Sequence, residues 1–365
     1  MSADFHPYAW TLWLAAGMTA VLVTRNPLYL IILLLAASFL YAILLRRAAR
    51  QSADVTHSQP MAWRVIVRLA FFLWGFAILF NALTVHVGEH ILFSLPASWP
   101  IIGGNITLEA IIYGFVTGLN FVSLILLFAI YNSVLGPHTI LRMIPGFAYQ
   151  TGVAISIAIS FVPQTVIAWS EIREAQRLRG HKVKGLRDTL PLFVSLLGYG
   201  LDRAIQLAES MDARGFGGRI LPAAPREIWL IRTGAISGLV LLLAGLVVKS
   251  YNRSTPWAGL LLLAAGAVLM GLSLWRGGGR VKRTRYRRWW WRPRDTILAG
   301  GSGLLLTAAL LLSWLNPEAI FYYPYPPYDI LPDFNPFLGL LFILPILPAL
   351  LLPPPIANQS LAIDN

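Results

Sequence analysis

The sequence predicts an all-α polytopic membrane protein with a pair of long cytoplasmic helices. Of its 365 residues, 57% are hydrophobic and 12% are charged, and the mean hydropathy is +0.65. Charged residues make up about a quarter of an ordinary soluble domain. Apolar runs long enough to cross a bilayer recur along the chain, and the basic residues gather in a few of the connections between them. Together these features exclude a disordered chain, a coiled coil and a compact soluble enzyme.

Eight apolar runs are predicted to cross the membrane. They lie at 9–24, 27–45, 65–85, 106–131, 228–248, 257–275, 296–315 and 337–352. The first two form a tight pair around the turn Arg25-Asn26-Pro27. The last run is short and contains Pro345 and Pro348, so the expected number of spans is seven or eight.

The 29 Lys and Arg residues predict the orientation, because short cytoplasmic loops carry an excess of basic residues. The connections 46–64, 132–227 and 276–295 are basic and are predicted to be cytoplasmic. The connections 86–105 and 316–336 contain no Lys or Arg and are predicted to be external. The N-terminus is then inside.

A further apolar stretch at 148–168 is predicted not to cross. If it crossed, Arg142 and the basic residues beyond 168 would face opposite sides of the membrane. The stretch also contains Pro163 and Gln164, so we expect a helix at the cytoplasmic membrane surface. The chain then divides into an N-terminal membrane domain of four spans (1–131), a cytoplasmic or interfacial segment (132–227) and a C-terminal membrane domain of three or four spans (228–365).

Two helices are predicted in the cytoplasmic segment, from about Ala154 to Arg179 and from about Gly185 to Arg214. The second is amphipathic. Its apolar face consists of Leu190, Phe193, Val194, Leu197, Leu201, Ile205, Ala208 and Met211, and its polar side carries Asp202, Arg203, Gln206 and Glu209.

The two helices end alike. Each has an acid, four residues, an Arg and a Gly, as Glu174 to Arg179-Gly180 and as Glu209 to Arg214-Gly215. A Gly past a helix end with a cation beside it is also the pattern of an ordinary C-cap. The repetition in one segment favours a second interpretation, in which each Arg is a rigidly held guanidinium that enters a groove of a partner protein.

These features resemble the transmembrane T component of energy-coupling factor (ECF) transporters, a branch of the ABC importers, over about residues 1–230. The resemblance rests on Arg25-Asn26-Pro27, Gly88 with Leu92-Phe93, Leu108-Glu109 with Gly114 and Gly118, Pro163, and above all the paired Arg-Gly endings.

The resemblance implies a coupling subunit in a prokaryotic cell membrane. Its partners would be two ABC ATPase subunits and a membrane-embedded substrate-binding S component, with uptake of a vitamin or metal ion among the possible activities. The ATPase-coupling residues would be Arg179 and Gly180 at the first tip, and Ala213, Arg214 and Gly215 at the second. The first tip has Leu178 where the family prefers Ala.

No catalytic residue, cofactor or metal is expected. The chain has no Cys and no G-x-x-x-x-G-K phosphate loop, so ATP hydrolysis is assigned to the partners. The open alternatives are a membrane scaffold or another ABC-type permease that uses the same basic segment, or a membrane-embedded enzyme.

Three other patterns receive structural interpretations. His86 to His90 matches the zinc-peptidase pattern H-x-x-E-H, but Gly88 interrupts it, and we expect a polar external turn. The basic run 276–294 with its three Trp residues is expected at the lipid interface, not on nucleic acid. Glu109 is expected at a hydrated helix start capped by Thr107 or Asn105.

Overall fold

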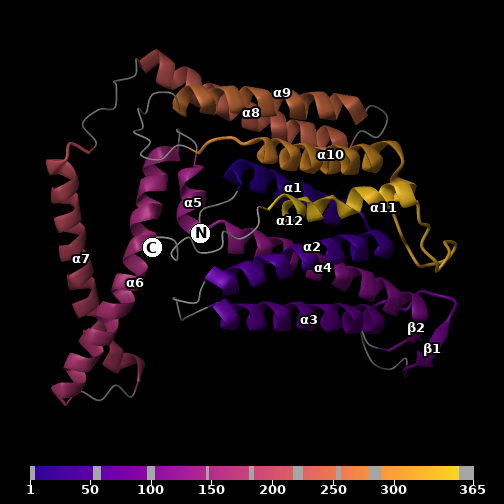
Figure 1. The fold of residues 1–365 in the computed structure, drawn as a ribbon, viewed down its shortest axis with the longest axis horizontal. Coiled ribbons are helices and arrows are strands. Elements are labelled where there is room, and N and C mark those ends of the chain that lie inside the picture. The colour runs from indigo at the N-terminus through magenta and orange to yellow at the C-terminus, as the bar shows by residue number, and fades with distance from the viewer. Residues whose placement is uncertain are drawn as a thin grey trace, which may run out of the picture. The chain divides into compact units, whose positions relative to one another are not determined.

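The computed structural model describes residues 5–51, 59–96, 103–144, 148–180, 185–216, 225–251, 256–278 and 289–352 (Figure 1). Its elements are α1 (Pro7–Val23), α2 (Pro27–Gln51), α3 (Gln59–Thr84), β1 (Ile91–Ser94), β2 (Asn105–Thr107), α4 (Leu108–Val134), α5 (Pro137–Arg142), α6 (Tyr149–Leu178), η2 (Leu186–Thr189), α7 (Leu190–Ala213), α8 (Pro225–Tyr251), α9 (Pro256–Gly278), α10 (Pro293–Leu315), η3 (Pro317–Ala319), α11 (Pro336–Ile343), η4 (Leu344–Ile346) and α12 (Leu347–Leu351).

The predicted fold class is confirmed: the chain is an all-α polytopic membrane protein. Within the described ranges, seven helices are long and apolar enough to cross a membrane. They span Pro27–Arg47, Arg64–Thr84, Leu108–Val134, Gln150–Leu178, Arg226–Ser250, Trp257–Gly277 and Pro293–Leu315.

Two of the predicted spans, and the apolar stretch that is predicted not to cross, need comment. The runs at 9–24 and 337–352 correspond to shorter apolar helices, Pro7–Val23 and Pro336–Leu351, and the second is broken into α11, η4 and α12. The stretch at 148–168 falls in α6, which by length and composition is itself a candidate span. That α6 stays on the cytoplasmic side is therefore a prediction.

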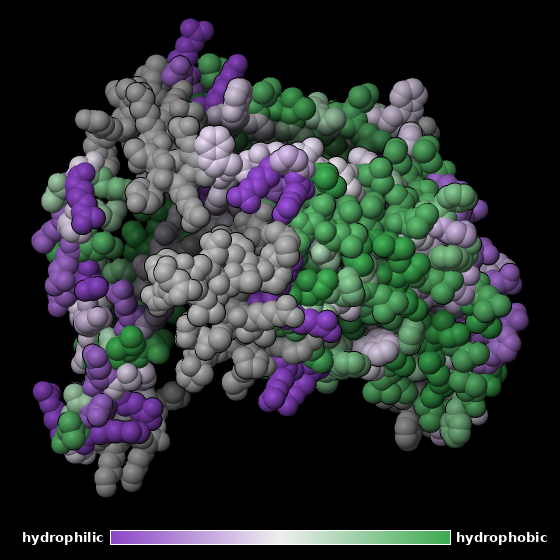
Figure 2. Space-filling model, viewed as in Figure 1, coloured by the Kyte–Doolittle hydropathy of each residue, from purple (hydrophilic) through white to green (hydrophobic). Residues whose placement is uncertain are grey.

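The chain forms two compact units. The first contains Met1–Pro137 and Arg288–Asn365, and the second contains His138–Arg287. The division into membrane and cytoplasmic segments is a different one and stays a prediction. Figure 2 shows a broad apolar surface over the helices of the first unit, as expected for contact with lipid.

The core of the first unit lies around α4, which packs against α1, α2 and α3, while α10 packs on α1. Trp10, Leu33, Leu127 and Leu298 are fully or almost fully buried in this core. These helices are therefore fixed by side-chain packing, although each also carries an apolar outer face.

Two glycines let α3 and α4 approach closely. A Cβ on Gly114 would lie 2.8 Å from the Ile78 Cα and 2.9 Å from the Ala77 carbonyl oxygen, both in the backbone of α3. A Cβ on Gly118 would collide with the indole of Trp74 and lie 3.0 Å from its Cα. Small residues spaced by four give membrane helices this kind of contact.

The turn between α1 and α2 is joined to the connection after α10. The Thr24 hydroxyl and the Arg25 amide both donate to the Ile320 carbonyl, at 3.1 and 3.0 Å. The Asn26 side chain donates to the Asp333 carbonyl at 2.6 Å and its Oδ1 caps α2 through the Leu28 amide. The Arg25-Asn26-Pro27 sequence thus anchors a loop from the other end of the chain.

Asp295 joins the starts of α1 and α10. Its carboxylate is 1% exposed and accepts the amides of His6 and Arg292, both at 2.7 Å. The His6 ring lies 5.0 Å, between centroids, from the Trp291 ring. Burial lowers the pKa of His6 below its usual value, although the charge of Asp295 opposes this shift.

The second unit contains two helix pairs, α8 with α9 and α6 with α7. The α8–α9 pair is close because glycines face each other: a Cβ on Gly238 would lie 3.0 Å from the Gly266 carbonyl oxygen. Gly238 and Gly266 therefore serve helix packing.

Candidate functional site

The predicted site residues lie at the ends of α6 and α7, where each Arg is the C-cap and each Gly is the next residue. Gly180 has φ +83° and Gly215 has φ +71°, the left-handed conformation that glycine adopts without steric cost. Each Gly amide donates to a carbonyl of the preceding turn: Gly180 to Arg177 at 2.9 Å, and Gly215 to Asp212 at 2.8 Å.

At the end of α7 the hydrogen bonds complete a Schellman motif. The Phe216 amide donates to the Met211 carbonyl at 2.9 Å, and this hydrogen bond encloses the one from Gly215 to Asp212. The motif stops the helix sharply and fixes the direction in which the chain leaves. The two similar sequences therefore fold into similar ends.

Both guanidinium groups belong to exposed residues, and Leu178 beside Arg179 is 85% exposed. Within the described part of the chain, neither Arg179 nor Arg214 has an ion-pair partner. A cation held at a rigid, exposed helix end can form bidentate hydrogen bonds with a carboxylate or with backbone carbonyls of another protein.

The two tips are far apart. The described part of the chain resumes at Gly185, so η2 and the start of α7 follow the first tip after a short connection. Arg214 ends α7, whose 24 residues span about 36 Å at the rise of an α-helix. Figure 1 shows α6 and α7 running in opposite directions, so the tips lie at opposite ends of the pair.

The apolar face of α7 has little cover in the isolated chain, although α7 packs on α6. Leu192 is buried, whereas six apolar side chains are about half exposed or more. They are Leu190 at 65%, Phe193 at 52%, Val194 at 60%, Leu197 at 57%, Leu201 at 63% and Ile205 at 49%. The polar residues Asp202, Arg203 and Glu209 are exposed as well, and Figure 2 shows hydrophilic side chains over this helix pair.

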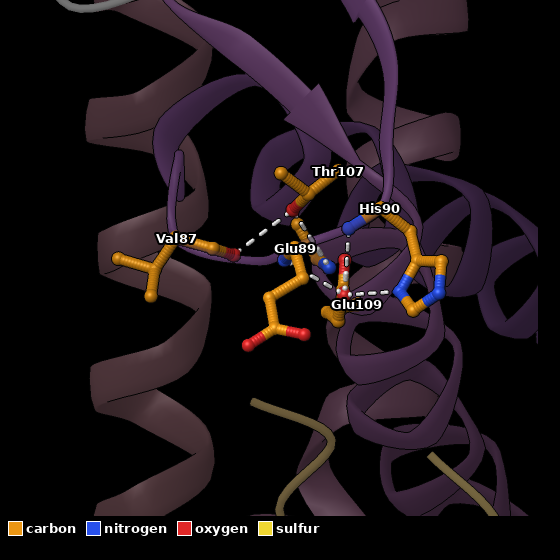
Figure 3. A network of polar contacts seen from close by, with 6 residues as sticks. Val87, Glu89, His90, Thr107 and Glu109 are labelled. Carbon is orange, nitrogen blue, oxygen red and sulfur yellow. Dashed lines mark hydrogen bonds and ion pairs between the residues drawn. The ribbon is translucent and has the colours of Figure 1, made fainter. Parts of the chain in front are cut away.

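A second polar site, which the sequence did not predict, lies at the start of α4 (Figure 3). Glu109 is 1% exposed, so the expected hydrated helix start is wrong. Its Oε1 accepts the amides of Glu89 and His90 at 3.0 Å and lies 2.9 Å from the Nδ1 of His90. Thr107 is the N-cap of α4, as expected, and its hydroxyl also donates to the Val87 carbonyl at 3.0 Å.

This network accounts for the H-x-x-E-H pattern. His90 pairs with Glu109, and His86 Nδ1 lies 3.3 Å from the carbonyl oxygen of Asn105 in β2. Gly88 packs against Glu109 so closely that any Cβ there would collide with the carboxylate. Among the residues that can be described, no three His, Asp or Glu side chains come together as metal ligands. The network holds the β1–β2 connection on the end of α4.

No local sequence signal reveals the burial of Glu109, because it depends on the close packing of Gly88. Glu109 follows the Thr107 cap by two residues, and Gly88 lies 21 residues before Glu109. The two residues belong to separate segments, so neither position indicates contact by itself. Only the pairing of β1 with β2 brings them together.

Comparison with known proteins supports the predicted family. No family model matches the chain. The energy-coupling factor transporter transmembrane protein EcfT of Lactococcus lactis is 26% identical over 159 residues, which cover 39% of this chain and 57% of that protein. The EcfT of Streptococcus thermophilus is 31% identical over 93 residues, 24% of this chain and 34% of that protein.

The matches are partial: the chain spans 57% and 34% of the lengths of these two curated relatives. They agree with the family resemblance predicted from the sequence and with the helical membrane fold. The resemblance predicted from the sequence is therefore confirmed: this chain is similar to the transmembrane components of energy-coupling factor transporters.

Proposed function

We propose that this chain is the transmembrane coupling component of an ECF-type ABC importer in a prokaryotic cell membrane. Arg179 and Arg214 would each dock into one of two partner ATPase subunits. The helices α6 and α7 would transmit the ATP-driven movement of those subunits to a membrane-embedded substrate-binding component. The observation that carries this proposal is the pair of matching helix ends, each with an exposed Arg before a left-handed Gly.

The separation of the tips supports two binding partners instead of one. A gap on the order of 36 Å, the length of α7, is too long for both guanidinium groups to enter one small pocket. Closure of two ATPases around nucleotide would move the two tips relative to each other. Because each tip continues directly into a rigid helix, such a movement would be passed on as a rigid-body motion.

The uncovered apolar face of α7 supports contact with the substrate-binding membrane component. A face with Leu197 at 57% and Leu201 at 63% exposure is unfavourable in water and marks an interaction surface. We assign it to the membrane component that binds the substrate and to the adjoining lipid. The transported compound, a vitamin or metal ion for example, would be selected by that component.

The proposal requires the tips to face the cytoplasm, where ATP is available. The charge distribution favours this side, since the connection 132–227 is basic while 86–105 and 316–336 contain no Lys or Arg. It also requires that α6 does not cross the membrane. Pro163 within α6 agrees with an interfacial position.

Assembly with purified partners tests the proposal. Removing a well-buried interface Arg costs roughly 2–4 kcal/mol, so Arg214→Ala is expected to weaken ATPase binding by about 30- to 700-fold. Arg179→Ala combined with Arg214→Ala is expected to abolish substrate uptake by vesicles that contain the whole complex.

The matched control is Arg203→Ala, which removes an exposed Arg from the polar side of the same helix. It is expected to leave assembly and uptake unchanged. Normal assembly and uptake by the double variant would refute the coupling function. Retained binding of some other protein, with no ATPase among the co-purified chains, would favour the scaffold alternative.

A further inference from the structure

A cavity of about 310 Å³ lies between α2, α3 and α4 in the first unit. Its walls include Leu34 and Ser38 of α2, Val67 and Phe71 of α3, and Leu126 of α4. Among the described lining residues, only Ser38 and the indole of Trp74 carry a polar side-chain atom. Phe71 is 63% exposed, so the cavity opens at the outer surface of the helices. In a membrane, this opening faces the hydrocarbon of the bilayer.

The helix packing fixes the shape of the cavity. Both α2 and α3 pack on α4 and not principally on each other, which leaves a groove between them. Trp74 forms part of the wall: its indole lies over Gly118, and its Nε1 donates to the Phe115 carbonyl at 3.2 Å. The groove is therefore held open by contacts that do not involve an occupant.

One end of the groove is strongly basic. Arg64 and Arg68 are exposed on α3. They precede the lining residues Val67 and Phe71 by three positions, so each lies about one helical turn from the groove wall. Arg46 is exposed on α2 and continues the row of residues 34, 38 and 42 at four-residue steps. Neither α2 nor α3 contains an Asp or Glu.

An occupant of this groove must be apolar along its length and anionic at the basic end. We propose that the groove binds an anionic glycerophospholipid, with one acyl chain between α2 and α3 and the phosphate at Arg46, Arg64 and Arg68. Basic clusters at the membrane surface attract such headgroups, and the apolar walls accommodate the hydrocarbon. The site does not depend on the coupling function and is distinct from both Arg-Gly tips.

Lipid retention tests the proposal. The purified full chain is incubated with equal amounts of dioleoyl phosphatidylglycerol and dioleoyl phosphatidylcholine in detergent, and bound lipid is counted by native mass spectrometry. The wild type is expected to retain phosphatidylglycerol with a preference of about 30-fold, from two or more arginines at the headgroup. Equal retention of the two lipids would overturn the site.

Two variants separate the contribution of the headgroup contacts to lipid retention from that of the apolar groove. Arg64→Gln with Arg68→Gln is expected to remove most of the preference, whereas Arg203→Gln, an exposed Arg on the polar side of α7, is expected to leave it unchanged. Ser38→Phe fills the groove and is expected to abolish retention, whereas Leu35→Phe, 64% exposed on the same helix, does not. Thermal unfolding confirms that each variant is folded.

Unchanged phosphatidylglycerol retention in both the double variant and Ser38→Phe would contradict the proposal. Loss of assembly with a membrane partner in Ser38→Phe, with lipid retention intact, would also contradict it and would assign the groove to a protein helix.

Discussion

The geometry of the second tip can be tested without removing its charge, by Gly215→Ala. The left-handed conformation at φ +71° costs a non-glycine residue about 1–2 kcal/mol. Nothing lies within 4 Å of the Cβ that the substitution adds, so this backbone strain is the whole effect. If the strained helix end unwinds, the docking conformation is populated less, and ATPase affinity is expected to fall by about 5- to 25-fold.

Controls from the same helix separate tip geometry from general effects on α7. Gly200→Ala also adds a methyl group with nothing within 4 Å, but inside the helix, where Ala is favoured by about 1 kcal/mol. It is expected to bind ATPase subunits as the wild type does. Gly215→Asn is expected to restore most of the affinity, because Asn tolerates the left-handed region.

The assay is a titration of the purified ATPase subunits against the immobilised chain in lipid nanodiscs. Wild-type affinity for Gly215→Ala, beside weakened binding for Arg214→Ala, would show that the left-handed Gly does not position the guanidinium. Equal losses for Gly215→Ala and Gly200→Ala would show that α7 responds to any substitution, which would also refute the reasoning.

Three further predictions concern the first unit. Gly118→Ala is expected to destabilise the chain by about 1–3 kcal/mol through overpacking of α3 on α4. Gly75→Ala adds a Cβ with nothing within 4 Å and is not expected to destabilise the chain; thermal unfolding measures both variants. Glu109→Gln removes a buried charged acceptor at a cost of about 1–3 kcal/mol, so the His90 amide should exchange hydrogen faster, as measured by mass spectrometry. The pKa of His6 is lowered in the folded state, so neutral His6 stabilises the fold above pH 6.5, and this contribution is lost as the pH falls through the folded pKa. The melting temperature of the wild type should therefore drop more than that of His6→Asn between pH 8 and 5.

The fold class could be predicted from the sequence because apolar length and charge placement act locally. The ends of α6 and α7 were also predictable, since Arg179-Gly180 and Arg214-Gly215 carry the signal of the left-handed cap. The same local rules place Thr107 at the start of α4.

Features that depend on contacts between distant segments were not predictable in the same way. Glu109 lies near a helix start, and only the β1–β2 pairing shows that this start is covered. Asp295 joins α10 to His6 across 289 positions, a contact that no periodicity indicates. Whether α6 crosses the membrane also escapes hydropathy, because its length and composition permit crossing while the flanking charges disfavour it.

Labelling of single cysteines tests the central claim most directly. The chain contains no cysteine, so Leu178→Cys and Ala213→Cys each report on one tip. In inside-out membrane vesicles, a membrane-impermeant maleimide is expected to label both positions, and added ATPase subunits are expected to protect them. Labelling of either position only from the external side, or full labelling of both in the assembled complex, would contradict the coupling of these helix ends to cytoplasmic ATPases.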